Sequence, residues 1–238
     1  MAKKLGGGGG GVTIVPFATG TDDEIVAMIQ AAHAGTIDLQ TDGGWAVGDT
    51  RTISVSAFST IGSAVTAQSA DIVITSFDEY NNCGNVMQFD FKRALAERSQ
   101  MHTSRTNEGG YGAMGLKTTV LPDMVNALPI WLKDSLIEFS VYARLSGGTI
   151  GTITGNKLAL RSADEVSLAN YGTGTAIQYY TTSANRIKTL GANGNAFKWW
   201  LRDAYGSTST SFTEVDGSGA YANDYVTDLR GISPFGCL

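Results

Sequence analysis

The residues between 203 and 228 combine aromatic rings with small polar side chains. Tyrosine supplies a large amphipathic contact area with few rotatable bonds, and Ser, Thr and Asn supply adaptable hydrogen bonds. Sugar binding uses the same two kinds of group: an aromatic face for stacking and polar groups that hydrogen-bond to the sugar hydroxyls. The alternative is a Gly-rich β-hairpin region with ordinary turn residues. We predict a ligand-binding surface made of Trp200, Arg202, Asp203, Tyr205, Ser207, Thr208, Ser209, Ser211, Phe212, Glu214, Asp216, Tyr221, Asn223, Asp224, Tyr225, Thr227 and Asp228.

Residues suited to catalysis are scarce. The chain has two histidines, His33 and His102, which leave few ways to build a Ser-His-Asp or Cys-His site. The sequence contains no CxxC, HExxH or EF-hand spacing, and its GGGGGG run lacks the Lys and Ser/Thr of a P-loop. We therefore expect no enzymatic activity, no metal site and no cofactor.

The polar segment is flanked by bulky residues at both ends. Trp199 and Trp200 precede it, and we expect alternation along a strand to turn one ring into the core and the other outward. Arg202 then shares the face of Trp200, where it either stacks or pairs with a buried carboxylate. At the other end, Phe235 and Leu238 return the chain to the core, so we predict an ordered segment.

Helical patterns occupy three stretches. The first begins with Thr21 as N-cap and Glu24 three residues later, a capping box, and has apolar residues on one face up to Gly35. Residues 92–101 also indicate a helix. Residues 121–132 indicate a helix broken by proline.

Strand patterns alternate with turn residues. We predict strands over residues 50–58, 71–77, 86–91 and 137–144. Short segments punctuated by Gly and Asn fill the rest. The fold class that follows is α+β, with mixed antiparallel β-sheets and a few short helices.

The composition limits the classes of partner. Of the 238 residues, 16% are charged and the formal net charge is -5, which argues against nucleic acid as a partner. No apolar run is long enough to span a membrane, and the start MAKKLGGGGGG is unlike a signal peptide. If the protein acts outside a cell, it leaves by another route, such as particle assembly and lysis. We favour Cys83 as a core residue over a disulfide between Cys83 and Cys237.

The motifs around the polar segment resemble a family of phage and prophage proteins of gut bacteria. These include NRIKTLGANGNAFKWWLRDAY, RGISPFGCL and, in the front half, IDLQTDGGWAVGDTRTISVSAF. Family members read roughly as WWxRS followed by a polar stretch and a terminal G-x-x-P-F-G-C-[IL]. The resemblance covers most of residues 35–238. This chain departs from the pattern at Asp203, where the family usually has Ser.

The resemblance implies a virion structural protein whose C-terminal region has a C-type-lectin-like fold. Proteins of that kind include the variable targets of diversity-generating retroelements, and here the candidate variable positions lie between Asp203 and Asp228. We divide the chain into three regions: a Gly-rich N-terminal arm (1–20), an α+β scaffold (21–134) and a C-type-lectin-like ligand-display region (135–238). The alternatives are a disordered N-terminus in place of the arm, which the glycine run also allows, and one continuous domain in place of the last two regions. The calcium-binding triplets of lectins are not evident.

We therefore expect a phage receptor-binding or host-attachment protein on the surface of the particle. Its expected partners are other virion subunits and a host cell-surface glycan or protein. A homo-oligomer, with a trimer favoured, suits this role, and neither nucleic-acid binding nor membrane insertion is expected. The alternative is a head decoration or a tail or baseplate component with no ligand of its own.

Overall fold

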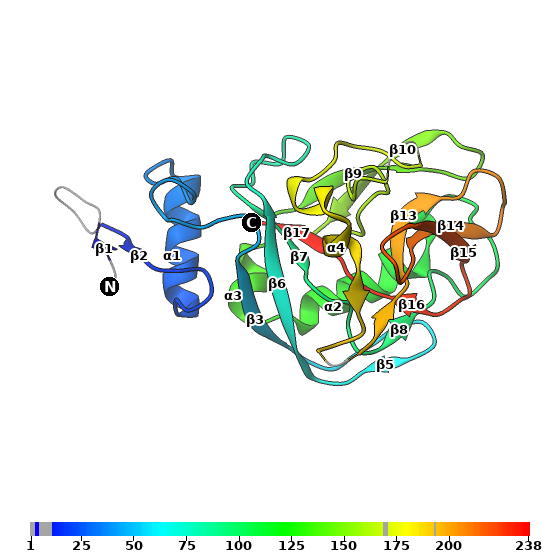
Figure 1. The fold of residues 1–238 in the computed structure, drawn as a ribbon, viewed down its shortest axis with the longest axis horizontal. Coiled ribbons are helices and arrows are strands. Elements are labelled where there is room, and N and C mark those ends of the chain that lie inside the picture. Colours follow the sequence, from blue (N-terminus) through cyan, green and yellow to red (C-terminus); the bar gives the residue numbers. More distant parts are fainter. Residues whose placement is uncertain (1–2, 5–10, 169–170, 193) are drawn as a thin grey trace.

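The computed structural model describes residues 3–4, 11–168, 171–192 and 194–238. Short helices and several antiparallel sheets confirm the α+β class (Figure 1). Most of the Gly-rich run predicted to be an arm lies outside the described residues. On either side of that run, β1 (Lys3–Lys4) pairs with β2 (Thr13–Ile14). These strands and the first helix lie at one end of the molecule (Figure 1).

Helix α1 (Asp22–His33) confirms the first predicted helix. The Thr21 hydroxyl accepts a hydrogen bond from the Glu24 amide at 3.3 Å, and the Glu24 carboxylate accepts one from the Thr21 amide at 2.8 Å. Both halves of the capping box are therefore formed. After the helix, Gly35 has a φ of 66°, the left-handed conformation that favours glycine at this position.

The first main sheet joins the two ends of the chain. Its order is β17 (Phe235–Cys237), β7 (Gln88–Phe91), β6 (Gln68–Ser76) and β3 (Thr50–Val55), all antiparallel. Alternate residues of β3 are buried, as period-2 patterning requires. The last residues of the chain thus complete a sheet begun in its first third.

The helix predicted over residues 92–101 is wrong. This segment is largely irregular and includes only the short strand β8 (Arg98–Ser99). Its backbone bonds go to distant partners: the Lys92 amide donates to the Asp71 carbonyl at 2.8 Å, and the Leu95 amide donates to the Ile232 carbonyl at 3.2 Å. Tertiary hydrogen bonds therefore override the local helix propensity.

The broken helix predicted over residues 121–132 is confirmed and extends further in both directions. A π-helical turn η2 (Leu116–Val120) leads into α2 (Leu121–Ala127), and α3 (Ile130–Ser135) follows. Pro129 lies between the two α-helices and ends the first, since it has no amide to donate.

The second main sheet carries the polar segment. Its order is β15 (Tyr221–Tyr225), β14 (Ser211–Val215), β13 (Trp199–Ala204), β16 (Arg230–Gly231) and β8. The hairpin of β9 (Phe139–Arg144) and β10 (Ile150–Asn156) packs beside β13. The remaining elements are β4 (Phe58–Ser59), β5 (Ala64–Val65), η1 (Tyr111–Ala113), η3 (Gln178–Thr181), α4 (Ser183–Arg186), β11 (Lys188–Thr189) and β12 (Ala196–Phe197).

Both faces of β13 are buried. Trp200 belongs to the main hydrophobic core, which extends from Val15 to Leu238. Trp199 belongs to a second, smaller cluster that includes Tyr180 and Val215. The two tryptophans thus point to opposite sides as predicted, but the expectation that one ring faces outward is wrong.

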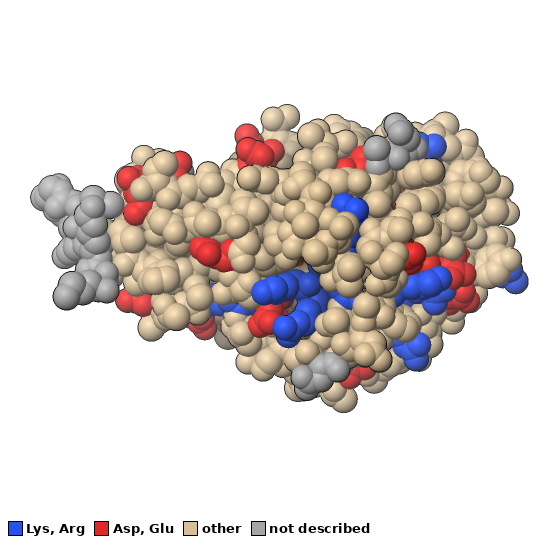
Figure 2. Space-filling view, viewed as in Figure 1, with Lys and Arg blue, Asp and Glu red and all other residues tan. Residues whose placement is uncertain are grey.

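Charged residues are few, 16% of the chain. The face in Figure 2 is mostly uncharged, and its Lys and Arg side chains lie from the middle toward the end opposite α1. Among the described helices, none combines the length and apolarity needed to cross a membrane.

Candidate functional site

A cleft of about 370 Å³ lies beside the polar segment, among the ends of β9, β13, β14 and β15. We call it the tyrosine cleft. These strands lie at the end of the molecule opposite α1 (Figure 1). The described residues that line it are Arg144, Gly148, Tyr171, Ala204, Tyr205, Gly206, Ser207, Thr213 and Tyr221.

Two tyrosine rings form one wall of the tyrosine cleft. Tyr171 and Tyr221 stack with their ring centroids 3.8 Å apart and an interplanar angle of 17°. Burial raises the pKa of Tyr221 above its ordinary value, with smaller contributions from Tyr205 and Tyr171. The Tyr221 phenol therefore keeps its proton at neutral pH and can donate a hydrogen bond to a ligand.

Arg144 supplies a positive charge to the same cleft. Its Nε atom is buried and has no hydrogen-bond partner among the described residues. No carboxylate of these residues lies within ion-pair distance of its guanidinium. A buried donor without a partner costs free energy, so this group gains from a ligand that brings an acceptor.

Hydrogen bonds and close packing fix the residues that follow Tyr171. The Thr173 amide donates to the Ser162 hydroxyl at 2.6 Å, and the Thr173 hydroxyl donates to the Tyr142 carbonyl at 2.6 Å. Gly172 lies so close to Ser162 and Asp203 that a Cβ atom there would overlap both. The contacts of Gly172 and Thr173 therefore fix the backbone next to Tyr171.

Asp203 is the buried acceptor beneath this loop. Its carboxylate accepts hydrogen bonds from the Ser162 hydroxyl at 2.7 Å, the Ala163 amide at 3.0 Å and the Arg144 amide at 3.0 Å. Burial raises its pKa, and the charge of Arg202 opposes that effect. Asp203 therefore ties β13 to β9 and to the loop under Tyr171.

Asn107 holds the loop on the other side of the cleft. Its side-chain amide donates to the carbonyls of Thr208 at 2.8 Å and Ser211 at 2.9 Å, and its backbone amide donates to the Ser209 carbonyl at 2.7 Å. These bonds shape the turn after Tyr205. Nothing in the sequence around Asn107 indicated this role, because the contact spans a long separation along the chain.

Six of the residues predicted to lie on a ligand-binding surface are buried instead, so their assignment to a surface is wrong. The main core covers one face of β13 and β14, and the second cluster covers the other face. Side chains that point to either face of these strands are therefore buried. The six are Trp200, Arg202, Asp203, Ser211, Phe212 and Glu214.

The other predicted residues are exposed or half-buried, and three of them line the tyrosine cleft. These three are Tyr205, Ser207 and Tyr221. The rest lie on the turns and on the edge strand β15, outside the cleft: Thr208, Ser209, Asp216, Asn223, Asp224, Tyr225, Thr227 and Asp228. Tyr171 and Arg144, which come from separate segments, were missed.

Ion pairs and a cation–π contact order the outer edge of the second sheet. Arg230 pairs with Asp224 and, at 3.3 Å, with Asp228, and its Nε donates to Glu214 at 2.6 Å. The guanidinium of Arg105 lies 3.4 Å from the ring centroid of Tyr225. These acidic side chains are therefore already engaged with cations of the protein.

The buried carboxylate pair anticipated as one option for Arg202 is present. Its two terminal nitrogens donate to the two Glu165 oxygens at 2.7 and 2.6 Å, and the Tyr80 hydroxyl donates to the same carboxylate at 2.6 Å. Burial acts to raise the pKa of Glu165, but Arg202, with smaller contributions from Arg161 and the Tyr80 hydroxyl, brings the pKa below its ordinary value. This pair supports β13 from inside.

Arg161 forms a second buried pair beside the first. Its guanidinium bonds to the Asp90 carboxylate, with the shortest contact at 2.7 Å, and lies 3.7 Å from the ring centroid of Phe235. The Tyr180 hydroxyl donates to Asp90 at 2.8 Å. Each buried charge in this network has an opposite charge and hydrogen bonds, the condition under which buried ions are tolerated.

The two cysteines are free thiols. The absence of a disulfide between them agrees with the interpretation that we favoured, but Cys83 is half-buried and packs against the main core rather than within it, whereas Cys237 is buried. Among the described residues, no group of three His, Cys, Asp or Glu side chains is placed to hold a metal ion. The arrangement at the tyrosine cleft suits stacking, hydrogen bonding and one charge contact.

A family model for DUF6273, a domain of unknown function, matches residues 92–238, which is more than half of the chain. No curated protein and no solved structure matches. The matched residues include every residue that lines the tyrosine cleft.

Proposed function

The chain belongs to the DUF6273 family of domains of unknown function, and we propose that it is a recognition protein that binds a ligand in the tyrosine cleft. We assign it to the receptor-binding or host-attachment type on the surface of a phage particle. The ligand is a host cell-surface glycan or protein. The proposal rests on the cleft geometry and on the motif resemblance, since the family description gives no activity.

The stacked pair of Tyr171 and Tyr221 is the observation that carries the proposal. Aromatic rings that are held in place lose little conformational freedom when a ligand binds, so their contact area contributes efficiently to affinity. Arg144 and Ser207 add hydrogen-bonding groups on the same cleft. A few placed polar groups among aromatic walls are typical of a specific binding site.

The overall layout supports an attachment role. The N-terminal strands and α1 lie at one end of the molecule, and the strands around the tyrosine cleft lie at the other (Figure 1). The N-terminal end is thus available to contact other virion subunits while the cleft faces outward. Many copies on one particle, in a homo-oligomer with a trimer favoured, multiply a weak single contact into firm attachment.

The C-type-lectin-like assignment remains part of the proposal. Exposed residues of the turns and of β15, including Thr208, Ser209 and Asn223, suit positions that vary from one ligand to another. Buried residues such as Arg202 and Asp203 hold the strands and are expected to stay constant. Diversification, where it occurs, is therefore expected at the exposed positions only.

Binding of the purified protein to a panel of gut bacterial strains tests the proposal. The wild-type protein is compared with the double variant Tyr171→Ala/Tyr221→Ala, after circular dichroism has shown that both are folded. We expect saturable binding to at least one strain, and its loss in the double variant. Truncating a central aromatic contact usually costs about 2 kcal/mol or more, which is a decrease in affinity of roughly thirtyfold.

Two other outcomes contradict the proposal in different ways. Binding that survives in the double variant places the ligand site outside the tyrosine cleft. Absence of binding to every strain favours the alternative role, a head decoration or a tail or baseplate component without a ligand of its own.

A further inference from the structure

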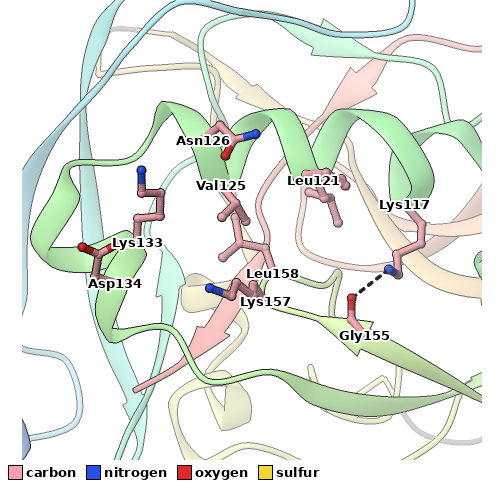
Figure 3. Close-up of a pocket in the computed structure, with 10 residues that line it drawn as sticks. Lys117, Leu121, Val125, Asn126, Lys133, Asp134, Gly155, Lys157 and Leu158 are labelled. Carbon is pink, nitrogen blue, oxygen red and sulfur yellow. Dashed lines mark hydrogen bonds between the residues drawn. The ribbon is translucent and has the colours of Figure 1, made fainter.

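A second cleft, of about 400 Å³, lies between the helical residues 116–135 and the chain at the end of β10. We call it the lysine cleft (Figure 3). It shares no lining residue with the tyrosine cleft. Its volume lies within the range of about 300–1,000 Å³ that is usual for small-ligand sites.

The middle of the lysine cleft is apolar. Leu121 and Val125 come from α2, and Leu158 comes from the chain after β10. Figure 3 shows these side chains between the helix and the chain after the strand, with Lys117 on one side of them and Lys133 and Asp134 on the other. Leu121 and Leu158 also belong to the main core, so the floor of the cleft is held rigidly.

Three lysines line the lysine cleft. In Figure 3, Lys133 lies at one end, and Lys157 lies beside Leu158 with its Nζ toward that end. Lys117 lies at the other end, where its Nζ donates to the Gly155 carbonyl at 3.3 Å. Burial lowers the pKa of Lys117, and the charge of Glu138 opposes this effect. The Lys117 ammonium group is thus partly shielded from water.

Positive charge exceeds negative charge around the lysine cleft. Asp134 is the carboxylate among its described lining residues, and Glu138 lies near Lys117. None of the three lysines pairs with a described carboxylate within 4.0 Å. This surplus occurs in a chain whose formal net charge is -5.

We propose that the lysine cleft binds a small organic anion, a phosphate or carboxylate attached to a compact apolar group. The ammonium groups of Lys133 and Lys157 hold the anionic end, as lysines do at many phosphate sites. The apolar group of the ligand lies against Leu121, Val125 and Leu158. This site is separate from the tyrosine cleft, so the two proposals stand or fall independently.

An NMR titration of the full chain with phenyl phosphate tests the proposal. We expect saturable shifts of the amides of Val125, Lys157 and Leu158, with a Kd of about 1 mM or tighter. Inorganic phosphate and phenol, which each offer half of the ligand chemistry, serve as matched probes. We expect each to bind at least tenfold more weakly than phenyl phosphate, because the anion and the ring contribute together.

Single substitutions assign the charge contacts. Lys157→Gln and Lys133→Gln are each expected to raise the Kd for phenyl phosphate several-fold, whereas Lys92→Gln, which removes the same charge outside the cleft, is expected to leave it unchanged. The proposal is overturned if the shifts fall outside the cleft, if phenol binds as well as phenyl phosphate, or if Lys92→Gln weakens binding as much as the cleft variants.

Discussion

At the scale of single residues, the ion pair of Arg202 and Glu165 stabilises the buried strand β13. Both side chains are almost fully enclosed, and each satisfies the charge of the other. Replacing Arg202 with Leu leaves Glu165 charged and buried without its two charge-assisted hydrogen bonds, with Arg161 at 3.9 Å as a more distant cation. We expect Arg202→Leu to lower the free energy of unfolding by about 3–5 kcal/mol, measured by urea denaturation.

A surface ion pair provides the control for that prediction. Arg93 pairs with Asp71 at 3.4 Å, and the Arg93 side chain is 40% exposed. Arg93→Gln is expected to change the free energy of unfolding by less than about 1 kcal/mol. Equal losses in the two variants would contradict the assignment of Arg202 to a buried pair that supports the strand.

Cys83 offers a prediction about pH. A hydrogen bond from the Cys237 thiol lowers the pKa of Cys83 to about 7, against the opposing effect of burial. Because the thiolate is the reactive form, the alkylation rate of Cys83 is expected to rise with pH and to reach half its maximum near pH 7. Mass spectrometry after iodoacetamide treatment measures it, with buried Cys237 unmodified in the native protein.

The variant Cys237→Ser checks the physical cause of that shift. The substitution removes the Cys237 thiol that donates to Cys83. The pH at which the alkylation rate of Cys83 reaches half its maximum is therefore expected to change. A wild-type midpoint above about pH 8, the region of an ordinary cysteine, would show that the thiol contact does not lower the pKa.

At the scale of elements, the loop from Tyr171 to Thr173 depends on Gly172. A Cβ atom at this position overlaps Ser162 and Asp203, so Gly172→Ala is expected to displace Tyr171. We expect a loss of about 1–3 kcal/mol of stability together with weaker ligand binding, measured by thermal denaturation and by a binding isotherm.

Gly217 is the matched control, because it lies in a turn outside the tyrosine cleft and tolerates a side chain. A Cβ atom there makes only ordinary contacts, the nearest at 3.5 Å from the Ala196 carbonyl oxygen. Gly217→Ala is expected to preserve both stability and binding. If Gly172→Ala behaves in the same way, the close packing under Tyr171 does not position that ring.

The secondary structure could be predicted where local signals and tertiary contacts agree. The capping box at Thr21 and the alternation in β3 are such cases, since both patterns depend only on neighbouring residues. The helix predicted over residues 92–101 failed because its amides bond to residues far away in sequence. Local propensity contains no information about such partners.

The tyrosine cleft could be predicted only in part for the same reason. Tyr205, Ser207 and Tyr221 lie in the polar segment that indicated recognition. Tyr171 and Arg144 come from other segments and meet them only in the folded chain. Residues such as Phe212 and Glu214 share the composition of the segment but are enclosed, because β14 is covered on both faces.

At the scale of the whole molecule, the two sheets connect the candidate site to the rest of the chain. The terminal strand β17 pairs with β7 in the first sheet, and Arg202 of β13 in the second sheet forms a buried ion pair with Glu165. This connection is consistent with the proposed attachment role. The tyrosine cleft and the lysine cleft, the two proposed binding sites, share no lining residue.

The most direct test compares two single variants in a saturation-binding isotherm on a strain that the wild-type protein binds. Tyr171 and Tyr142 are 47% and 46% exposed, but only Tyr171 lines the tyrosine cleft. We predict that Tyr171→Ala raises the Kd about tenfold or more, while Tyr142→Ala leaves it within about twofold of the wild-type value. Equal effects of the two substitutions would contradict the claim that the tyrosine cleft is the ligand site.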